Sequence, residues 1–535
     1  MNQAKLLDCT LRDGGYVNDW EFGHNALTSI LERLVSAKVD IIEVGFLDER
    51  RPFDENRSIM PDTASVQKIY GKVDKGQSSI VAMIDYGTCS IEHLQPCADS
   101  YLDGIRVIFK KHVMHEAIDF CRQVKALGYK VFTQAVSITS YNDDELLELV
   151  ALVNDLKPYA LSMVDTYGLL HQSNLMHIFE IMDKHLDPAI SIGYHAHNNF
   201  QMGYANCIEV LEKPTARPLL VDASLYGMGK SAGNTPIELL AMYMNEHGDH
   251  DYDLHQILEA IEVDVMEIYR RVPWGYTLFY YVAASHKCHP NYVAYLLNKK
   301  SLSIRSVGEI LDAIPHEKKL LYDQKYIENA YLDYQRMECD DADAVAALKA
   351  ALGGREVLLL GPGRCVQEEA ARIEDYIAAH HPVVISINYQ PPGFTPDYVF
   401  FSNAKRYSQM ASQLLEPEYA NLPLIATSNV LKTSGQFTYV LNYSRLIDTT
   451  TDIPDNSLVM FLRVLREVGA ARIALAGFDG YSPSRMNYVN TNMEYDFVKD
   501  KAAYLNDYVR AFLRSMQGRP PVVFVTQSRY QENDA

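Results

Sequence analysis

Short runs of apolar residues recur through the first half of the chain, and most are apolar on successive rather than alternate positions. This pattern is typical of strands buried on both faces, as in a parallel sheet. Amphipathic stretches with helical spacing, such as 143–156, lie between the runs. The apolar runs are Lys5–Thr10, Val39–Val44, Ser79–Ile84, Gly104–Phe109, Lys130–Val136, Ala160–Val164, Ile190–Tyr194 and Leu219–Ser224.

A strand followed by a helix, repeated eight times over roughly 230 residues, predicts an α/β fold of the TIM type, a (β/α)8 barrel. An open doubly wound sheet repeats the same units and is the alternative. We favour the barrel because the count is eight and because polar residues gather directly after the strands.

A second α/β pattern begins at Glu356 and predicts an open Rossmann-like sheet. The domains expected are the barrel over 1–300, a helical extension over 301–354 and a Rossmann-like domain over 355–535. The second pattern consists of predicted strands at Val357–Leu360, Val383–Asn388, Tyr398–Ser402, Leu424–Thr427, Arg472–Ala476 and Val522–Thr526, with helices at Val366–Ala379 and Ser457–Val468.

The net charge and the composition exclude some classes of binding partner. The formal net charge of −20 argues against a nucleic-acid or anionic-membrane partner, because no basic field attracts phosphate. No stretch approaches the roughly 18 apolar residues of a spanning helix. The 8 cysteines are scattered without a Cys-x-x-Cys pair, and no secretory leader is recognisable, so we expect a cytoplasmic protein with reduced thiols.

Polar residues that follow the predicted barrel strands include a possible metal site. His195 and His197 are two apart at a strand end, so their imidazoles can face the same ion. Asp13, after the first strand, could add a carboxylate across the barrel mouth. Three nitrogen and oxygen ligands leave open positions for substrate, as a catalytic metal requires, and favour Mn²⁺, Mg²⁺, Co²⁺ or Zn²⁺.

These residues stand in motifs that resemble a known family. The motifs match the metal-dependent aldolase/Claisen TIM-barrel superfamily (HMG-CoA lyase-like), and the chain most resembles its 4-hydroxy-2-oxovalerate aldolase-like proteins. The resemblance covers about residues 4–300. The motifs are Leu7-Asp8-Cys9-Thr10-Leu11-Arg12-Asp13-Gly14-Gly15, Ile42-Glu43-Val44-Gly45, Tyr194-His195-Ala196-His197-Asn198-Asn199 and Gly227-Met228-Gly229-Lys230-Ser231-Ala232-Gly233-Asn234.

The resemblance implies a lyase that splits, or forms by reversal, a 4-hydroxy-2-oxo acid into pyruvate and an aldehyde through a metal-stabilised enolate. Mn²⁺ is the expected ion, and a homo-oligomer acting on small molecules is expected. The alternatives are a Claisen-type acyltransferase joining an acyl-CoA to a 2-oxo acid, and a ligand-binding barrel without catalysis.

The resemblance also implies site residues. The metal ligands would be Asp13, His195, His197 and Asn234, although an asparagine there could instead stabilise its loop. Arg12 would steady the carbonyl or enolate oxygen, with a salt bridge to Glu43 as a further or alternative role, and Glu43 joins the catalytic candidates. Thr166 would touch the substrate carboxylate, unless it simply ends a strand.

The proton-transfer base departs from the family pattern. The aldolases have a histidine three residues after the metal aspartate, and this chain has Tyr16. An unperturbed tyrosine, with a pKa of about 10, is a poor base at neutral pH. Trp274-Gly275-Tyr276 resembles the aldolase segment that carries an active-site tyrosine. Tyr16, Tyr276 and a water on the metal therefore remain alternatives.

Three loops of the second domain contain residues that could bind a ligand. Gly361-Pro362-Gly363, Ser402-Asn403-Ala404-Lys405-Arg406 and Gly477-Phe478-Asp479-Gly480-Tyr481 each follow a predicted strand and would share one sheet edge. The pattern is loosely similar to Rossmann-like domains of glycan and pterin-pyrophosphate enzymes. Binding of a nucleotide or phosphorylated ligand is one interpretation, and a structural or oligomerising role is the other.

Overall fold

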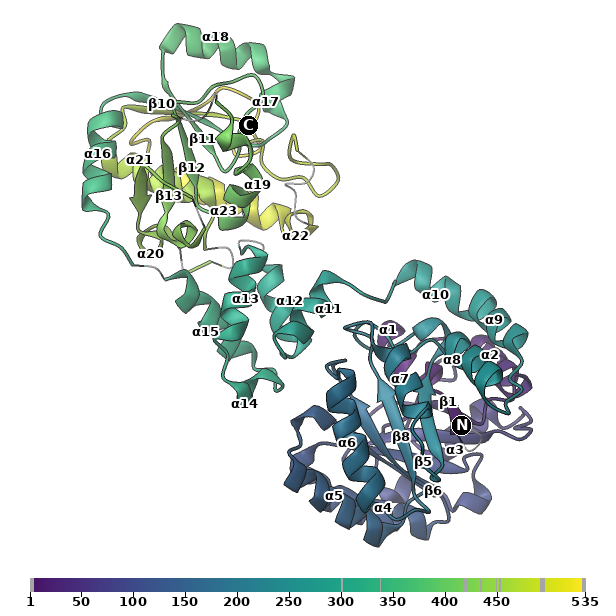
Figure 1. Ribbon diagram of the computed structural model, residues 1–535. Helices are drawn as coiled ribbons and strands as arrows, with labels where there is room; N and C mark the ends of the chain where they lie inside the picture. The colour runs from purple at the N-terminus through teal and green to yellow at the C-terminus, as the bar shows by residue number, and fades with distance from the viewer. Residues whose placement is uncertain are drawn as a thin grey trace. The chain divides into compact units, whose positions relative to one another are not determined.

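The chain folds as two compact units, Met1–Pro290 and Asn291–Ala535. The computed structural model describes residues 4–531 apart from 300–301, 337, 418, 420, 434, 449, 452–453 and 491–495 (Figure 1). Among these residues, every helix is too short or too polar to cross a lipid bilayer.

The sheet of the first unit is a closed barrel. Strand β1 pairs in parallel with β9 on one side and with β2 on the other, where Leu7 lies opposite Ile41. This last pairing confirms the TIM barrel over the open sheet. The barrel strands are β1 (Ala4–Asp8), β2 (Ile41–Leu47), β4 (Ser79–Asp85), β5 (Gly104–Phe109), β6 (Lys130–Val136), β7 (Ala160–Asp165), β8 (Ser191–Ala196) and β9 (Leu219–Ala223). The short strand β3 (Ile59–Met60) pairs with β2.

Helices cover the outside of the barrel, as α4, α5 and α6 show in Figure 1. The segment after β4 contains only two 3-10 turns, Ile91–His93 and Cys97–Asp99, because Gly87 and Pro96 interrupt it. The barrel helices are α1 (Gly15–Asn18), α2 (His24–Ser36), α3 (Thr63–Tyr70), α4 (Met114–Ala126), α5 (Asp143–Leu156), α6 (Gln172–His185), α7 (Gly203–Leu211) and α8 (Ile237–His247), followed by α9 (Leu254–Ala260), α10 (Met266–Arg271) and α11 (Leu278–Ser285).

The barrel interior is layered. One apolar cluster comprises Leu7, Cys9, Ile41, Val81, Phe132, Ala160 and Leu220. Since alternate residues of a strand face the same side, the next inward positions on four of these strands hold polar side chains. They are Glu43, Gln134, Ser162 and Asp222, all buried. The apolar layer thus supports a polar layer, and the strand ends above it carry the candidate site.

The second unit contains a seven-stranded parallel sheet in the order β14-β13-β12-β11-β10-β15-β16. Sequence reasoning did not predict β14, whose three residues are too short for a recognisable pattern. The strands are β10 (Glu356–Leu360), β11 (Val383–Ile387), β12 (Tyr398–Phe401), β13 (Leu424–Thr427), β14 (Tyr439–Leu441), β15 (Arg472–Ala476) and β16 (Val522–Phe524).

The helices of the second unit differ from expectation at one place. The helix predicted over 366–379 is two helices that meet at Glu369, whose backbone leaves the helical region. The helices are α12 (Pro290–Asn298), α13 (Ile304–Asp312), α14 (His316–Lys319), α15 (Gln324–Gln335), α16 (Ala342–Leu352), α17 (Cys365–Glu368), α18 (Ala370–His380), α19 (Ala404–Met410), α20 (Tyr443–Leu446), α21 (Ser457–Val468), α22 (Asp496–Asp500) and α23 (Ala502–Ser515).

Candidate metal centre

The chain leaves β1 through a single π-helical turn, Thr10–Gly14, and all five of its residues are buried. The turn is held by Trp20, whose indole N–H donates to the carbonyl of Arg12 at 2.8 Å, and by Ser58, whose hydroxyl donates to that of Leu11 at 2.6 Å. Such wide turns are frequent at functional sites. The consecutive side chains of Arg12 and Asp13 are both buried in this turn.

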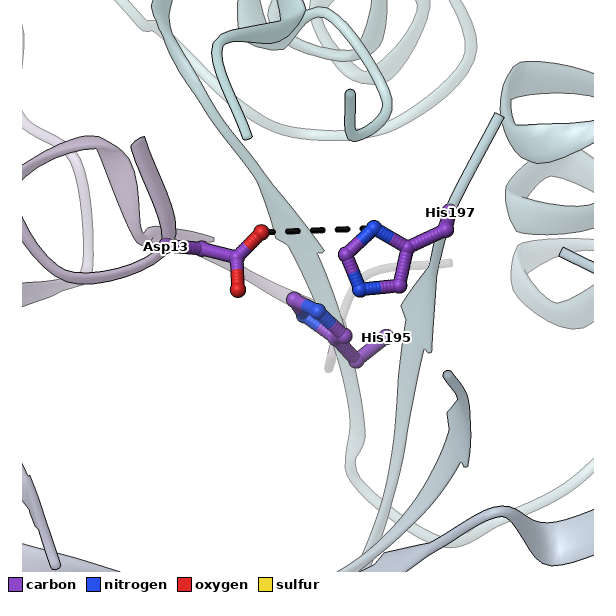
Figure 2. Close-up of side chains that lie close together, drawn as sticks. All are labelled: Asp13, His195 and His197. Atoms are coloured by element: carbon purple, nitrogen blue, oxygen red, sulfur yellow. Dashed lines mark ion pairs between the residues drawn. The ribbon is translucent and has the colours of Figure 1, made fainter. Parts of the chain in front are cut away.

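Asp13 meets the two histidines of β8 and its end. Asp13, His195 and His197 offer ligand atoms that all lie within 4.8 Å of one another (Figure 2). Oδ2 of Asp13 lies 4.0 Å from Nδ1 of His197, and the imidazole centroids are 5.1 Å apart. Ligands on opposite sides of a first-row ion lie about 4.2 Å apart, since each bond is about 2.1 Å long. Three ligands cannot all be opposite one another, so the three side chains would have to move closer together to share one ion.

Buried polar atoms without partners support this assignment. Among the residues the structure describes, Nδ1 of His197 and Oδ1 of Asn234 are buried and lack a hydrogen-bond partner. Buried polar groups are normally satisfied, so such atoms indicate a missing partner. The amide nitrogen of Asn234 donates to Oδ2 of Asp13 at 2.9 Å, which places Asn234 beside the three ligands. The donor set fits a divalent cation.

The electrostatics keep these candidate ligands in the protonation states that bind metal. Burial lowers the pKa of His197 to about 3, so its imidazole is neutral at physiological pH. Burial alone would raise the pKa of Asp13, but opposing effects, of which the charge of Arg12 is the largest and the hydrogen bond from Asn234 is another, hold that pKa below its ordinary value. A neutral imidazole and an ionised carboxylate are the forms that bind metal.

A chain of buried charges connects Asp13 to His195. Arg12 donates from Nη1 to Asp13 and from Nε to Glu43, at 2.5 and 2.7 Å. The same oxygen of Glu43 accepts from Nη1 of Arg106 at 2.9 Å, and Arg106 pairs with Asp222. Nδ1 of His195 lies 2.9 Å from Asp222, which leaves its Nε2 for an ion. Positive and negative side chains alternate along this buried network, so each charge is paired with an opposite charge without water.

Sequence reasoning proposed Glu43 as catalytic and missed Arg106 and Asp222. The structure places Glu43 fully buried between two guanidinium groups. This position favours a role in holding Arg12. A signal for the missed pair was present, because a charged residue interrupts each of two otherwise apolar strands, β5 and β9.

Thr166 lies at the end of β7 with its hydroxyl already engaged. Its Oγ1 accepts a hydrogen bond from the backbone N–H of Ser137 at 2.8 Å. Ser137 has a left-handed backbone, with φ of 54°. The threonine hydroxyl thus stabilises a strained loop at the barrel mouth and still has its own proton to donate.

The two tyrosines proposed as bases differ in their surroundings. The Tyr16 ring packs edge-on against Trp20, and the ammonium of Lys230 lies 5.0 Å from its centroid. Tyr16 is 41% exposed, and partial loss of water around the phenol, followed by the charge of Asp13, raises the pKa of Tyr16 above its ordinary value. Tyr276 is 53% exposed, and its ring contacts Tyr281.

A closed parallel barrel with Asp, His and His converging at its carboxyl-terminal mouth defines a (β/α)8 enzyme domain with a candidate divalent-metal centre. Residues 3–263, which include all the barrel strands, match the model of the HMGL-like family. This match and the relatives named 4-hydroxy-2-oxovalerate aldolase indicate a lyase or aldolase enzyme.

Several known proteins are similar to part of this chain at low identity. A 4-hydroxy-2-oxovalerate aldolase of Marinomonas sp. (strain MWYL1) is 24% identical over 278 residues, covering 50% of this chain and 79% of the relative. An oxaloacetate decarboxylase of Mycobacterium tuberculosis is 24% identical over 283 residues, covering 50% and 80%. The solved HMG-CoA lyase of Bacillus subtilis is 15% identical with a TM-score of 0.41, covering 51% of this chain and 94% of that one.

Proposed function

We propose that the barrel is a divalent-metal-dependent aldolase that splits a 4-hydroxy-2-oxo acid into pyruvate and an aldehyde, or joins the two. The observation that carries the proposal is the meeting of Asp13, His195 and His197 beside the guanidinium of Arg12. Relatives named 4-hydroxy-2-oxovalerate aldolase support the substrate class.

Asp13, His195, His197 and Asn234 would hold the cation, with Mn²⁺ expected ahead of Mg²⁺, Co²⁺ or Zn²⁺. When bound, a divalent cation acts as a Lewis acid that stabilises negative charge on a keto oxygen. The nitrogen and oxygen donors of this site suit all four ions.

Arg12 would bind the oxygen that gains charge during the reaction. A guanidinium has five N–H donors, and Asp13 and Glu43 account for two of them. Because Glu43 and Trp20 fix the position of Arg12, its charge needs no rearrangement as the enolate forms. Thr166 would donate its hydroxyl proton to the substrate carboxylate while accepting from Ser137.

Cleavage also needs a base for the proton of the 4-hydroxyl group. Tyr16 stands where the aldolases have a histidine, and its raised pKa makes the phenolate scarce at pH 7. Tyr276, which is more than half exposed, is the second candidate. We place Tyr16 first because it lies near Asp13, as the electrostatic effect of that carboxylate on its pKa indicates.

The test is release of pyruvate from a panel of 4-hydroxy-2-oxo acids by the purified chain with Mn²⁺. The wild type should release pyruvate, and His195→Ala should release none. His177→Ala is the matched control, because His177 is exposed on α6 and bonded to Asp143. Absence of pyruvate across the whole panel would refute the aldolase assignment.

Decarboxylation of oxaloacetate is a second candidate function, favoured by the replacement of the histidine base by Tyr16 and by a relative with that name. Loss of CO₂ leaves the same pyruvate enolate and removes no hydroxyl proton. If this is the reaction, Tyr16→Phe should decarboxylate oxaloacetate at close to the wild-type rate. If the aldolase assignment with Tyr16 as base holds, the same variant should lose pyruvate release from 4-hydroxy-2-oxo acids.

A further inference from the structure

The three loops singled out in the second unit meet in one cleft of about 180 Å³. It is lined by Gly363 after β10, by Asn403 and Arg406 after β12, and by Gly477 and Asp479 after β15. Strand β10 is the first of its sheet in sequence, yet β11 lies on one side of it and β15 on the other. Open α/β sheets bind ligands at this point, where the strand order reverses.

One wall of the cleft contains a carboxylate oxygen that accepts no hydrogen bond from the residues the structure describes. Asp479 is 6% exposed, and its Oδ2 accepts from the backbone N–H of Cys365 at 3.1 Å. Its Oδ1 is buried without a hydrogen-bond partner in the part of the chain that the structure describes. A buried carboxylate oxygen is costly unless it is hydrogen-bonded. The wall therefore suits a ligand that brings a hydroxyl group to Asp479.

The glycines of this wall position Asp479. A Cβ on Gly363 would lie 2.3 Å from Oδ1 of Asp479 and 2.5 Å from the carbonyl oxygen of Gly477. The N–H of Gly363 already donates to that carbonyl at 2.8 Å. The Gly-Pro-Gly turn thus closes against the loop after β15, and its amide is not available for phosphate.

Other residues that line the cleft are suited to an anion. Arg406, only 6% exposed, lines the cleft together with Lys299, and its Nη1 donates to Gln409 at 3.0 Å. Asp455 lines it as well, with its carboxylate accepting from the hydroxyl of Tyr443 at 3.3 Å. The first residues of the 12-residue helix α21 also line it, and helix N-termini attract negative charge. Asn388 connects the start of α21 to the loop after β12, because its amide donates to Ser457 at 2.6 Å and to Ser402 at 3.2 Å.

We propose that this cleft binds a phosphorylated sugar, either free or as part of a nucleotide. The phosphate faces Arg406, Lys299 and the N-terminus of α21, and a sugar hydroxyl donates to Oδ1 of Asp479. The site lies wholly within the second unit, so the chain carries a binding function separate from the barrel chemistry.

Calorimetric titration of the full chain with ribose 5-phosphate and with AMP tests the proposal. At least one should bind saturably, while free ribose and inorganic phosphate bind at least tenfold more weakly. Tighter binding of AMP would identify a nucleotide, and equal binding a sugar phosphate. If neither phosphorylated probe binds, or free ribose binds equally well, the proposal is overturned.

Variants locate the binding in the cleft. Asp479→Asn keeps the size of the side chain and should weaken binding at least tenfold, with a circular dichroism spectrum like that of the wild type. Asp375→Asn, on the exposed surface of α18, should bind as the wild type does. His195→Ala should also bind normally, which separates this site from the barrel. Unchanged binding by Asp479→Asn would overturn the assignment.

Discussion

Nδ1 of His195 lies 2.9 Å from Oδ2 of Asp222, and both side chains are buried. A carboxylate on one ring nitrogen fixes the tautomer and orientation of an imidazole, so that the other nitrogen faces the metal. The same carboxylate is paired with Arg106. The orientation of His195 therefore depends on a residue of β5, on a different part of the barrel wall.

Asp222→Asn should weaken metal binding by about 10- to 100-fold, the usual effect of losing such a partner. It should also lower stability, because Arg106 keeps its buried charge without this anion. Metal affinity is measured by titration of the metal-free protein with Mn²⁺. Asp183→Asn is the control, since Asp183 pairs with Arg217 and belongs to no part of the network at the site. Equal affinity in the two variants would contradict the role of Asp222.

Glu43→Gln should destabilise the barrel by about 3–5 kcal/mol, because two buried guanidinium groups would then face a neutral amide. The midpoint of urea unfolding, followed by tryptophan fluorescence, measures the change. Glu180→Gln removes an exposed partner of Lys213, 3.6 Å away, and should cost no more than about 1 kcal/mol. A comparable midpoint shift in both variants would refute the distinction.

Gly229→Ala should abolish metal binding while leaving the barrel folded. The added Cβ would lie 2.4 Å from the amide nitrogen of Asn234 and 2.7 Å from Oδ2 of Asp13, and so would displace both. Gly14→Ala is the matched change, because the atoms nearest to its Cβ belong to the flexible Met228 side chain, the first at 3.0 Å. Metal content after dialysis distinguishes the two, and a Gly229→Ala protein that retains its ion would contradict the geometry.

Asp8 should make the barrel less stable as pH rises from about 4 to 7. Burial raises the pKa of Asp8 to about 7, so the folded protein binds a proton in this range that the unfolded chain has lost. Each unit of pKa corresponds to about 1.4 kcal/mol. Asp8→Asn removes this titration, so its urea midpoint should rise relative to the wild type across the same pH range. A constant difference between the two proteins would exclude this contribution.

The strands of the barrel could be predicted from the sequence because each is a run of apolar residues flanked by polar ones. Gly104–Phe109 and Lys130–Val136 have the predicted bounds in the structure. Asp13, His195 and His197 could be placed near one another because barrel strands present their carboxyl ends at one mouth. Their assignment as metal ligands stays a prediction.

The buried network could not be predicted in the same way. Arg106 and Asp222 are 116 residues apart in sequence, and their pairing depends on the interior layer on which each strand places its side chain. The fixed orientation of Arg12 likewise depends on Trp20 and a π-helical turn, which no periodic pattern encodes. Long-range ion pairs and irregular turns of this kind need the folded barrel to become visible.

Strand β1 is synthesised long before β9, the strand with which it pairs. The hydroxyl of Thr10 accepts a hydrogen bond from the backbone of Leu225, 215 residues later. At a translation rate of about 5–20 residues per second, a ribosome needs about 10–40 s to make that stretch. During this interval the nascent β1 has no β9 to pair with, and Asp13 emerges well before His195 and His197.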